Sequence, residues 1–250
     1  SIKLVRSIQT KTFMKSDRIV VIGESMKDRI IREYKVGSDR VSVIENWGMK
    51  RLENIVIVRS NVSSRIRLLY TGNLGETHEI DTLLGAMRIL ADTNTKDSFC
   101  FRFVGLGSNF VRLKRVCTEE RLTIAEFSDP VSEEDLVNEY MNSDISLVIS
   151  NKAIEGTLVP SKFYTAVLFN PVVFIGGITD TPAQHIINGD FGCVLENGDS
   201  EGLVRILNEL RLNRDRLQSM RTNAKAYYYA NLSSSIRIAQ WKNLIDELSK

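Results

Sequence analysis

Short apolar runs alternate with longer helical patterns along most of this chain, and this alternation limits its possible folds more than any other feature. Runs rich in β-branched and aromatic residues predict strands at residues 18–22, 41–44, 66–70, 99–104, 122–127, 145–148, 171–175 and 193–195. Apolar residues at helical spacing predict helices at residues 82–93, 109–119, 133–141 and 200–211. Apolar strands that alternate with helices are typical of a parallel sheet covered on both faces. We therefore predict an α/β fold with a doubly wound, Rossmann-like parallel sheet.

The alternation is lost at residues 45–64, which hold polar turn residues and are predicted to form a linker. Residues 1–44 predict only a helix–strand–helix–strand piece, which is too small to own a core and has to dock on something else. Residues 65–230 predict a complete doubly wound domain. The last fifty residues read as helix throughout, with one break near residues 231–235, so residues 231–250 are predicted to be a separate C-terminal helix.

Composition excludes several classes of function. The 33 basic and 31 acidic residues nearly cancel, which gives no reason to expect nucleic-acid binding. No apolar run approaches the roughly 20 residues that span a bilayer, so we expect no transmembrane segment. The three cysteines are widely spaced without a CxxC pattern, which favours free thiols in a reducing cytosol over a zinc site or disulfides. We therefore expect a cytoplasmic protein.

Two glycine turns each follow a predicted strand and precede a helix. The first contains Gly72, Asn73 and Gly75, and the second contains Gly105, Gly107 and Ser108. Glycine lets the backbone approach a ligand closely, and amides at a helix N-terminus favour an anion. The alternative for each is an ordinary strand-to-helix turn. Because both turns lie at the carboxyl ends of strands in one sheet, where ligands bind, they support each other.

A third stretch, "EGTLVPSKFYTAV", contains Glu155, Pro160, Ser161 and Lys162. If Pro160 is the first residue of a helix, Ser161 and Lys162 lie in its first turn and can meet a phosphate with a hydroxyl and a positive charge. Glu155 lies in the preceding loop, where a carboxylate can accept hydrogen bonds from sugar hydroxyls. Taken singly, a solvated lysine and a loop carboxylate are the simpler explanations. Together with the two glycine turns, the stretch favours a binding site.

Other candidates are weaker. His78 starts a helix and could bind a phosphate or a sugar hydroxyl. The equally good alternative is a histidine at the start of a helix that binds no ligand. Asp129, Pro130 and Val131 end a strand and could line a base pocket, although a plain loop fits equally well. Trp47 is expected to pack the linker, and His185 receives no role. The sequence has no GxSxG, HExxH or Walker lysine motif.

The order of these features resembles the retaining glycosyltransferase family 4, which has the two-domain GT-B fold. The resemblance is closest to the branch that acts in bacterial cell-surface polysaccharide synthesis. It rests on "SDRIVVIGESMKDRII", "DRVSVIENW", "LLYTGNLGETHEIDTLLGAM", "FRFVGLGS", "NSDISLVI", "EGTLVPSKFYTAV" and "GCVLENGDSEGLVRIL", which occur in family order from about residue 10 onward. Each stretch alone is weak evidence for the family, whereas the ordered set is specific to it.

The resemblance implies a role for each matching residue. The turn at residues 72–75 would face the donor diphosphate, and Lys162 with Ser161 would neutralise the diphosphate leaving group. Glu155 would match the first carboxylate of a paired-glutamate motif near the donor sugar. Residues 105–108 and 129–131 would border the nucleoside. The donor would be a UDP- or GDP-type sugar, and neither a metal ion nor another cofactor would be needed.

The sequence also departs from the family pattern. No carboxylate occurs near Tyr164 or Thr165, where the second glutamate is expected, and Phe169-Asn170 replaces the usual glycine before the next strand. Glu76-Thr77-His78 replaces a basic residue that often follows the first glycine turn. The resemblance implies that residues 1–44 are a remnant of the N-terminal acceptor domain, of which we expect only the last elements here. The helix at residues 231–250 would normally cross back to that domain.

We therefore expect the donor-binding part of a glycosyltransferase: a truncated form, a split subunit or a remnant gene product. Its reaction would transfer a sugar from a nucleotide-diphosphate sugar to a polysaccharide or lipid-linked acceptor with retention. One alternative is a noncatalytic or split-subunit module that binds nucleotide weakly and acts through a partner chain. A GT-B epimerase is a third option, for which the chain offers few acid and base residues. Exposed apolar faces of the first and last segments would favour a separate N-terminal-domain chain or a homo-oligomer as partner.

Overall fold

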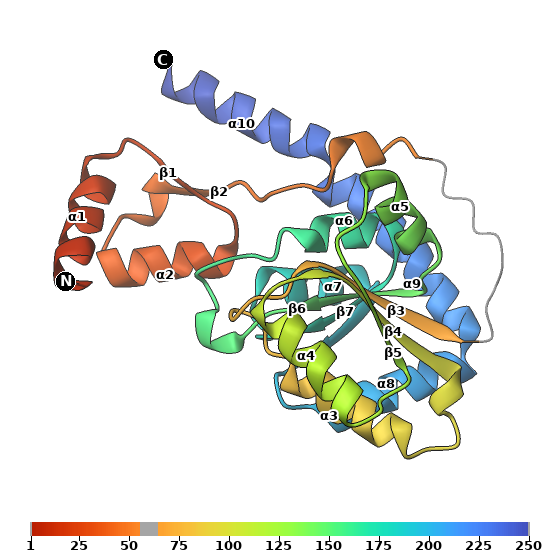
Figure 1. The fold of residues 1–250 in the computed structure, drawn as a ribbon. Helices are drawn as coiled ribbons and strands as arrows, with labels where there is room; N and C mark the ends of the chain where they lie inside the picture. Colours follow the sequence, from red (N-terminus) through yellow and green to blue (C-terminus); the bar gives the residue numbers. More distant parts are fainter. Residues whose placement is uncertain (1, 56–64, 250) are drawn as a thin grey trace.

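The computed structural model describes residues 2–55 and 65–249 (Figure 1). Within these residues, the main domain is built on a six-stranded parallel sheet with the strand order β5-β4-β3-β6-β7-β8. Its strands are β3 (Ile66–Asn73), β4 (Phe99–Leu106), β5 (Ala125–Ser128), β6 (Ile145–Ile149), β7 (Val172–Ile175) and β8 (Gly192–Leu195). The predicted α/β fold with a parallel sheet is therefore confirmed. Strand β5 begins three residues later than the run at 122–127 suggested.

Helices cover both faces of the sheet because successive strand residues are apolar on both sides. The helices of the main domain are α3 (Asp81–Ala91), α4 (Ser108–Glu119), α5 (Glu133–Met141), α6 (Lys162–Phe169), α7 (Thr181–Gly189), α8 (Ser200–Leu212) and α9 (Arg214–Tyr227). Leu68 and Tyr70 of β3 pack in one core with α3, α4 and α8. The intervening Leu69 packs in a second core with α5, α6 and α7. Each core lies on one side of the sheet, as a doubly wound fold requires.

The register of β3 and β4 places the two glycine turns side by side. Ile66 lies opposite Phe99, and the pairing continues to Gly72 opposite Gly105. Gly72 has φ 101° and Gly105 has φ 155°, values that favour glycine. A Cβ on Gly105 would lie 2.0 Å from the carbonyl oxygen of Gly72. The backbone conformation therefore favours glycine at both positions, and at Gly105 the close approach of the two strand ends also requires it.

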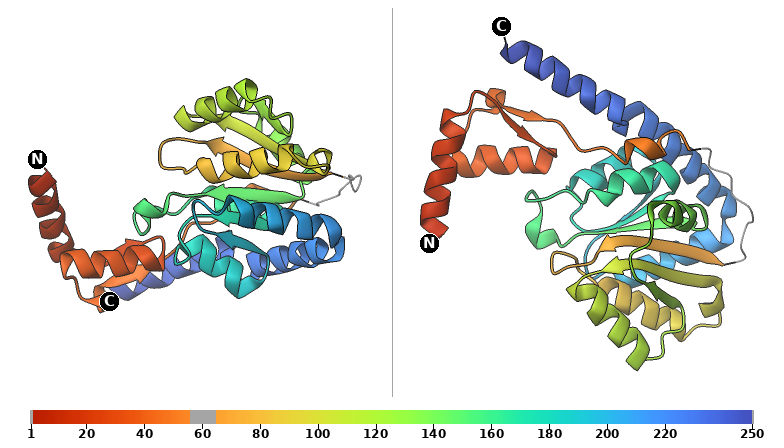
Figure 2. Two further views of the ribbon diagram at one scale, coloured as in Figure 1. Left: turned by 90° about the horizontal axis from the view of Figure 1, so that it is seen from below. Right: turned by 45° about the horizontal axis from the view of Figure 1, so that its top comes forward.

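An N-terminal lobe stands beside the main domain (Figures 1 and 2). It comprises α1 (Ile2–Lys15), β1 (Ile19–Val21), α2 (Glu24–Tyr34) and β2 (Val41–Val43), and its two strands pair in parallel. Contrary to the expectation that this piece owns no core, its strands contribute to a small cluster of buried side chains. The buried members are Ile19, Val21, Val36 and Val41. The lobe contacts the main domain through Arg29, whose guanidinium donates to the backbone oxygen of Glu155 at 3.3 Å.

The C-terminal part contains one more break than the sequence suggested. Helix α8 ends at Leu212, and Asn213 then caps α9 by accepting a hydrogen bond from the backbone N–H of Arg216 at 3.0 Å. A short π-helix (Tyr228–Leu232) follows α9, and α10 (Ser234–Leu248) begins after the predicted break. Helix α10 extends from the main domain towards the lobe, where Arg18 pairs with Glu247 at 2.7 Å (Figure 2).

Candidate donor-binding site

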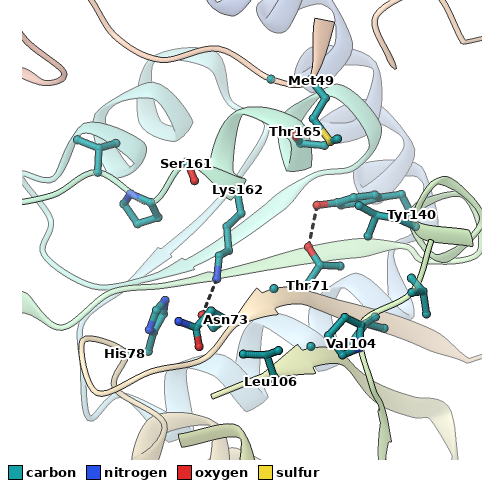
Figure 3. Close-up of a pocket in the computed structure, with 18 of the residues that line it drawn as sticks. Met49, Thr71, Asn73, His78, Val104, Leu106, Tyr140, Ser161, Lys162 and Thr165 are labelled. Atoms are coloured by element: carbon teal, nitrogen blue, oxygen red, sulfur yellow. Dashed lines mark hydrogen bonds between the residues drawn. The ribbon is translucent and has the colours of Figure 1, made fainter. Parts of the chain in front are cut away.

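A cavity of about 890 Å³ opens at the carboxyl edge of the sheet (Figure 3). It lies over the ends of β3 and β4, against the start of α6, where a doubly wound sheet binds its ligands. The described residues that line it are Trp47, Gly48, Met49, Thr71, Gly72, Asn73, Thr77, His78, Val104, Gly105, Leu106, Pro130, Val131, Leu136, Tyr140, Leu158, Val159, Pro160, Ser161, Lys162 and Thr165. The structure thus brings together parts of all three stretches that the sequence singled out.

Lys162 supplies the positive charge of the cavity. It is the first residue of α6, and Ser161 is the N-cap, so the helix begins two residues later than the prediction with Pro160 at its start. The ammonium contacts the phenol oxygen of Tyr70, lies 4.1 Å from the centre of that ring and is 3.3 Å from the backbone oxygen of Asn73. These contacts are with neutral oxygens and a π face, and burial lowers the pKa of Lys162 to about 7.

Tyr70, a residue of strand β3, accepts a hydrogen bond from the ammonium of Lys162. Its hydroxyl donates to the backbone oxygen of Asn73 at 2.9 Å, which leaves the oxygen lone pairs free to accept from Lys162. Burial raises the pKa of Tyr70 well above its ordinary value, so the phenol stays protonated. A Cβ on Gly72 would lie 3.8 Å from the ammonium nitrogen, so the first glycine turn lies directly beside the lysine.

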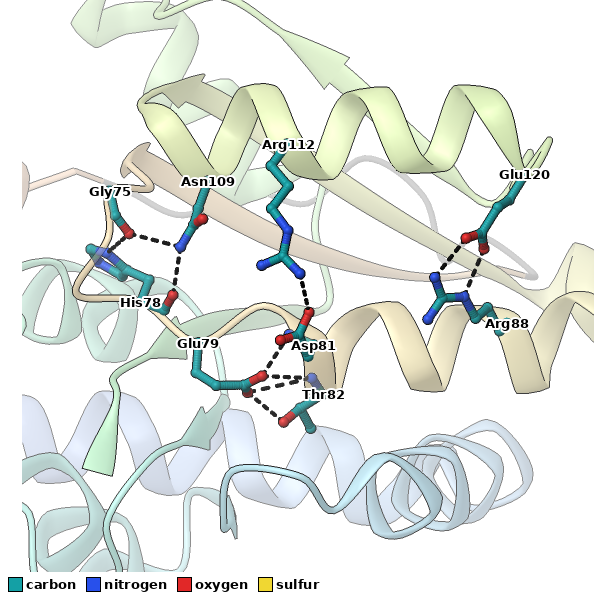
Figure 4. A network of polar contacts seen from close by, with 9 residues as sticks. All are labelled: Gly75, His78, Glu79, Asp81, Thr82, Arg88, Asn109, Arg112 and Glu120. Carbon is teal, nitrogen blue, oxygen red and sulfur yellow. Dashed lines mark hydrogen bonds and ion pairs between the residues drawn. The ribbon is translucent and has the colours of Figure 1, made fainter. Parts of the chain in front are cut away.

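His78 lies at the other side of the first glycine turn. Its Nδ1 donates to the backbone oxygen of Gly75 at 3.2 Å, and its ring makes an edge contact with Tyr70. Burial, followed by the charge of Lys162, lowers the pKa of His78 to about 4, so the ring is neutral near pH 7. Asn109 of α4 fixes this loop by donating to the backbone oxygens of Gly75 at 3.1 Å and His78 at 2.8 Å (Figure 4).

The second glycine turn reaches the cavity through Gly105 and not through its later residues. Gly107 has φ 124°, and a Cβ there would lie 2.4 Å from the side-chain oxygen of Asn73. The first amides of α4 donate to the backbone oxygen of Leu74, so part of this helix terminus is already satisfied. Gly75, Gly107 and Ser108 are not among the residues that line the cavity.

The end of the cavity remote from His78 is more apolar. Pro130 and Val131 line it, whereas Asp129 does not. At its floor, the hydroxyls of Thr71 and Tyr140 are 3.0 Å apart and hydrogen-bonded to each other. Thr165, at the position where the resemblance leads one to expect a carboxylate, also faces this end. Such a mixture of apolar and hydroxyl groups is typical of pockets that bind small organic ligands.

Glu155 lies outside the set of residues that line the cavity. Its carboxylate accepts a hydrogen bond from the Thr179 hydroxyl and lies beside Gly177, where a Cβ would be 2.5 Å from it. Burial and the charge of Glu155 raise the pKa of neighbouring Asp180 to about 6. The role of Glu155 near a donor sugar therefore stays a prediction.

Sequence reasoning missed one wall of the cavity. Trp47, Gly48 and Met49 belong to the stretch interpreted as linker, yet they line the cavity opposite the strand ends. Trp47 was expected to pack the linker, but 37% of its surface is exposed. No local pattern marks these residues, because they reach the site only through the folding of the linker onto α6. Among residues 2–55 and 65–249, no three His, Cys, Asp or Glu side chains form a group that could hold a metal ion.

Residues 53–227 match the model of the family described as glycosyl transferases group 1. The chain belongs to this family. None of the curated proteins with which it was compared matches it. No helix within the described part of this group 1 chain is long and apolar enough to cross a membrane.

Solved glycosyltransferase structures share the fold of this group 1 chain. Its structure superimposes on that of TarM from S. aureus with a TM-score of 0.73 at 14% sequence identity, and the alignment covers 95% of this chain and 45% of TarM. A glycosyltransferase from Rickettsia africae gives TM-score 0.77 at 17% identity, with 98% of this chain and 67% of that chain covered. HepE of Anabaena, in complex with UDP, gives 0.76 at 15% identity, with 93% and 64% covered. The group 1 chain thus spans about half to two thirds of these proteins.

Proposed function

We propose that this chain is the donor-binding part of a glycosyltransferase and that its cavity binds a nucleotide-diphosphate sugar. The observation that carries the proposal is the meeting of Gly72, Gly105 and Lys162 at one edge of the sheet. The diphosphate would lie against the two glycine turns beside the ammonium. The nucleoside would extend towards Pro130 and Val131. The complex of HepE with UDP supports a UDP-type donor.

In the proposed reaction, the bond between the anomeric carbon and the β-phosphate oxygen breaks, and its electron pair stays on that oxygen. An acceptor hydroxyl forms the new bond to the same carbon, with retention of configuration. Lys162 and the N-terminus of α6 would stabilise the charge that develops on the departing diphosphate. Glu155 would act near the donor sugar. We propose no metal ion or other cofactor, because the ammonium supplies the positive charge.

The acceptor would be a polysaccharide or a lipid-linked precursor of the bacterial cell envelope, and the reaction would take place in the cytoplasm, at or near the inner membrane face. An N-terminal acceptor domain would have to complete the cleft, either in the same polypeptide or as a separate chain. The apolar residues Leu4, Val5 and Ile8 of α1 are more than half exposed, which supports contact of the lobe with further protein.

Titration calorimetry with UDP, GDP and their sugar conjugates tests the proposal. Wild-type protein should bind at least one of these nucleotides, and Lys162→Ala should weaken binding by about 1.5–3 kcal/mol, as for loss of a charged hydrogen bond. Lys152→Ala is the matched control, because Lys152 is exposed and pairs only loosely with Glu196 at 4.0 Å. Equal affinity in wild type and Lys162→Ala would contradict the assignment of the diphosphate to this lysine.

A further inference from the structure

The segment between the lobe and the main domain carries an unexpected arrangement of buried polar groups. We call residues 45–53 the clamp segment. Its middle part, Trp47 to Met49, lines the cavity, and Met49 points towards Thr165 in Figure 3. Its two ends carry Glu45 and Glu53, each of which binds helices of the C-terminal part of the chain.

Glu45 fixes the first end of the clamp segment. Only 9% of its surface is exposed, and one carboxylate oxygen accepts hydrogen bonds from three different helices. Nε2 of His185 in α7 donates at 2.7 Å, the guanidinium of Arg237 in α10 at 3.1 Å, and the hydroxyl of Tyr164 in α6 at 3.3 Å. A buried carboxylate is tolerated only with such partners, so this end has one well-defined position.

Glu53 fixes the second end. Its carboxylate accepts from the hydroxyl of Tyr228 at 2.9 Å, and from the backbone N–H of Ser234 at 2.8 Å and its hydroxyl at 3.0 Å. The backbone oxygen of Glu53 also accepts from the hydroxyl of Tyr229. This carboxylate therefore caps the N-terminus of α10 and ties the clamp segment to the π-helix.

Gly48 brings the middle of the clamp segment directly against α6. A Cβ at this position would lie 2.7 Å from the hydroxyl of Tyr228, 3.3 Å from the backbone oxygen of Tyr164 and 3.4 Å from the backbone nitrogen of Thr165. The Tyr228 hydroxyl cannot move away freely, because it is hydrogen-bonded to Glu53. A side chain at residue 48 would consequently displace the clamp segment from its position against α6.

We propose that Trp47 and Met49 contact the nucleoside half of the bound nucleotide, and that Glu45 and Glu53 are positioning residues that hold this wall in place. The inference rests on the proposed function, because it concerns the ligand of the same cavity. The indole of Trp47 offers a large apolar face. A wall that is fixed before binding loses little conformational entropy when the ligand arrives, which strengthens binding.

Tryptophan fluorescence tests the contact. The chain has two tryptophans, so in Trp241→Phe the emission comes from Trp47 alone. Titration of this variant with the nucleotide that binds in calorimetry should change the emission, with the same midpoint as the heat. In Trp47→Phe, where emission comes from exposed Trp241 on α10, the same titration should change nothing. Heat of binding without a change in Trp47 emission would overturn the inference and leave the proposed function standing. If no nucleotide binds the wild type, both fail.

Two variants test the positioning role by different routes. Glu45→Gln keeps the shape of the side chain but removes its charge, and Gly48→Ala leaves the charges unchanged but adds the clashing methyl group. Each should weaken nucleotide binding about fivefold, at a temperature where the variant is folded, and should shift the emission of Trp47 in the free protein. Glu209→Gln, which removes the charge of an exposed ion pair with Arg216, is the control and should bind as wild type.

The Trp47 emission of the folded, ligand-free protein separates positioning from a general loss of stability, because it shifts only when the surroundings of Trp47 change. If Glu45→Gln does not fold, Gly48→Ala still tests the same wall. A folded Glu45→Gln or Gly48→Ala protein with wild-type affinity and wild-type Trp47 emission would overturn the positioning role.

Discussion

Two charged side chains are shielded from bulk solvent at helix α6, and their surroundings differ. Lys162 contacts the phenol of Tyr70 and a backbone carbonyl, which are neutral groups. Glu45 lies among donors, with a guanidinium and an imidazole within 3.1 Å of one carboxylate oxygen. The first arrangement holds a charge that an anionic ligand can complete. The second is already complete within the protein.

The comparison distinguishes a buried charge that serves ligand binding from one that holds structural elements together. Burying a charge without an opposite charge lowers stability, and proteins retain such a group where it acts on a ligand. A buried charge with full partners instead fixes the relative positions of the elements that contribute to it. Removal of the Glu45 charge should therefore lower the free energy of unfolding, whereas removal of the Lys162 charge should raise it. Measurement of both changes tests the comparison directly.

The largest effect is expected for Glu45→Ala. Removing the carboxylate leaves the buried Arg237 and the partly buried His185 without their acceptor, so the free energy of unfolding should fall by about 3–5 kcal/mol. Denaturant unfolding monitored by circular dichroism measures the change. Glu209→Ala, which breaks an exposed pair, should lose less than about 1 kcal/mol. Equal losses in the two variants would mean that the Glu45 cluster is not the fixed structure described above.

The sequence was sufficient to predict the sheet, because its signals are local. Each strand is an apolar run and each helix has its own spacing, so strand β3 with its glycine turn could be placed before the structure was known. The break at Asn213 was missed, since the residues on both sides of it keep a helical pattern and only the side-chain cap reveals it. Helix boundaries of this kind depend on single capping residues.

The candidate site was predictable only where the residues follow strands or start helices. The rule that strand ends share one edge of the sheet brought Gly72, Gly105 and Lys162 together from sequence alone. Glu45 could not be found this way, because His185 lies 140 residues and Arg237 lies 192 residues further along the chain. The same applies to Trp47, which lines the cavity although no local sequence pattern marks it.

A smaller effect of opposite sign is expected for Lys162→Met at pH 6. This change removes a half-buried charge that has only neutral partners, so the free energy of unfolding should rise by about 1–2 kcal/mol while nucleotide binding weakens as in Lys162→Ala. Thermal unfolding with and without nucleotide measures both. Lys152→Met, at an exposed lysine, should change neither. A loss of stability in Lys162→Met would show that the ammonium is structural.

The stability gain of Lys162→Met should depend on pH. The pKa of Lys162 is lowered from 10.5 in the unfolded chain to about 7 in the folded protein, so above pH 7 the unfolded state binds more protons. Wild-type stability should then rise with pH, by at most about 1.4 kcal/mol per unit from this group, and the variant lacks this rise. The difference between the two proteins should therefore shrink from pH 7 to pH 8.5, and parallel curves would contradict the lowered pKa.

The smallest effects are expected when a tyrosine beside each of the two charges is replaced by phenylalanine. Tyr70→Phe removes the hydroxyl that donates to Asn73 and accepts from Lys162, and Tyr164→Phe removes one of the donors to Glu45. Each should lower the free energy of unfolding by about 0.5–1.5 kcal/mol, the range for a single hydrogen bond.

The nucleotide affinities of the two variants, measured by calorimetry, should differ. Tyr70→Phe should weaken nucleotide binding by about twofold to fivefold, because the ammonium loses an oxygen that orients it. Tyr164→Phe should bind as wild type, because His185 and Arg237 still hold Glu45. Equal affinities in the two variants would mean that Lys162 keeps its position without the Tyr70 hydroxyl.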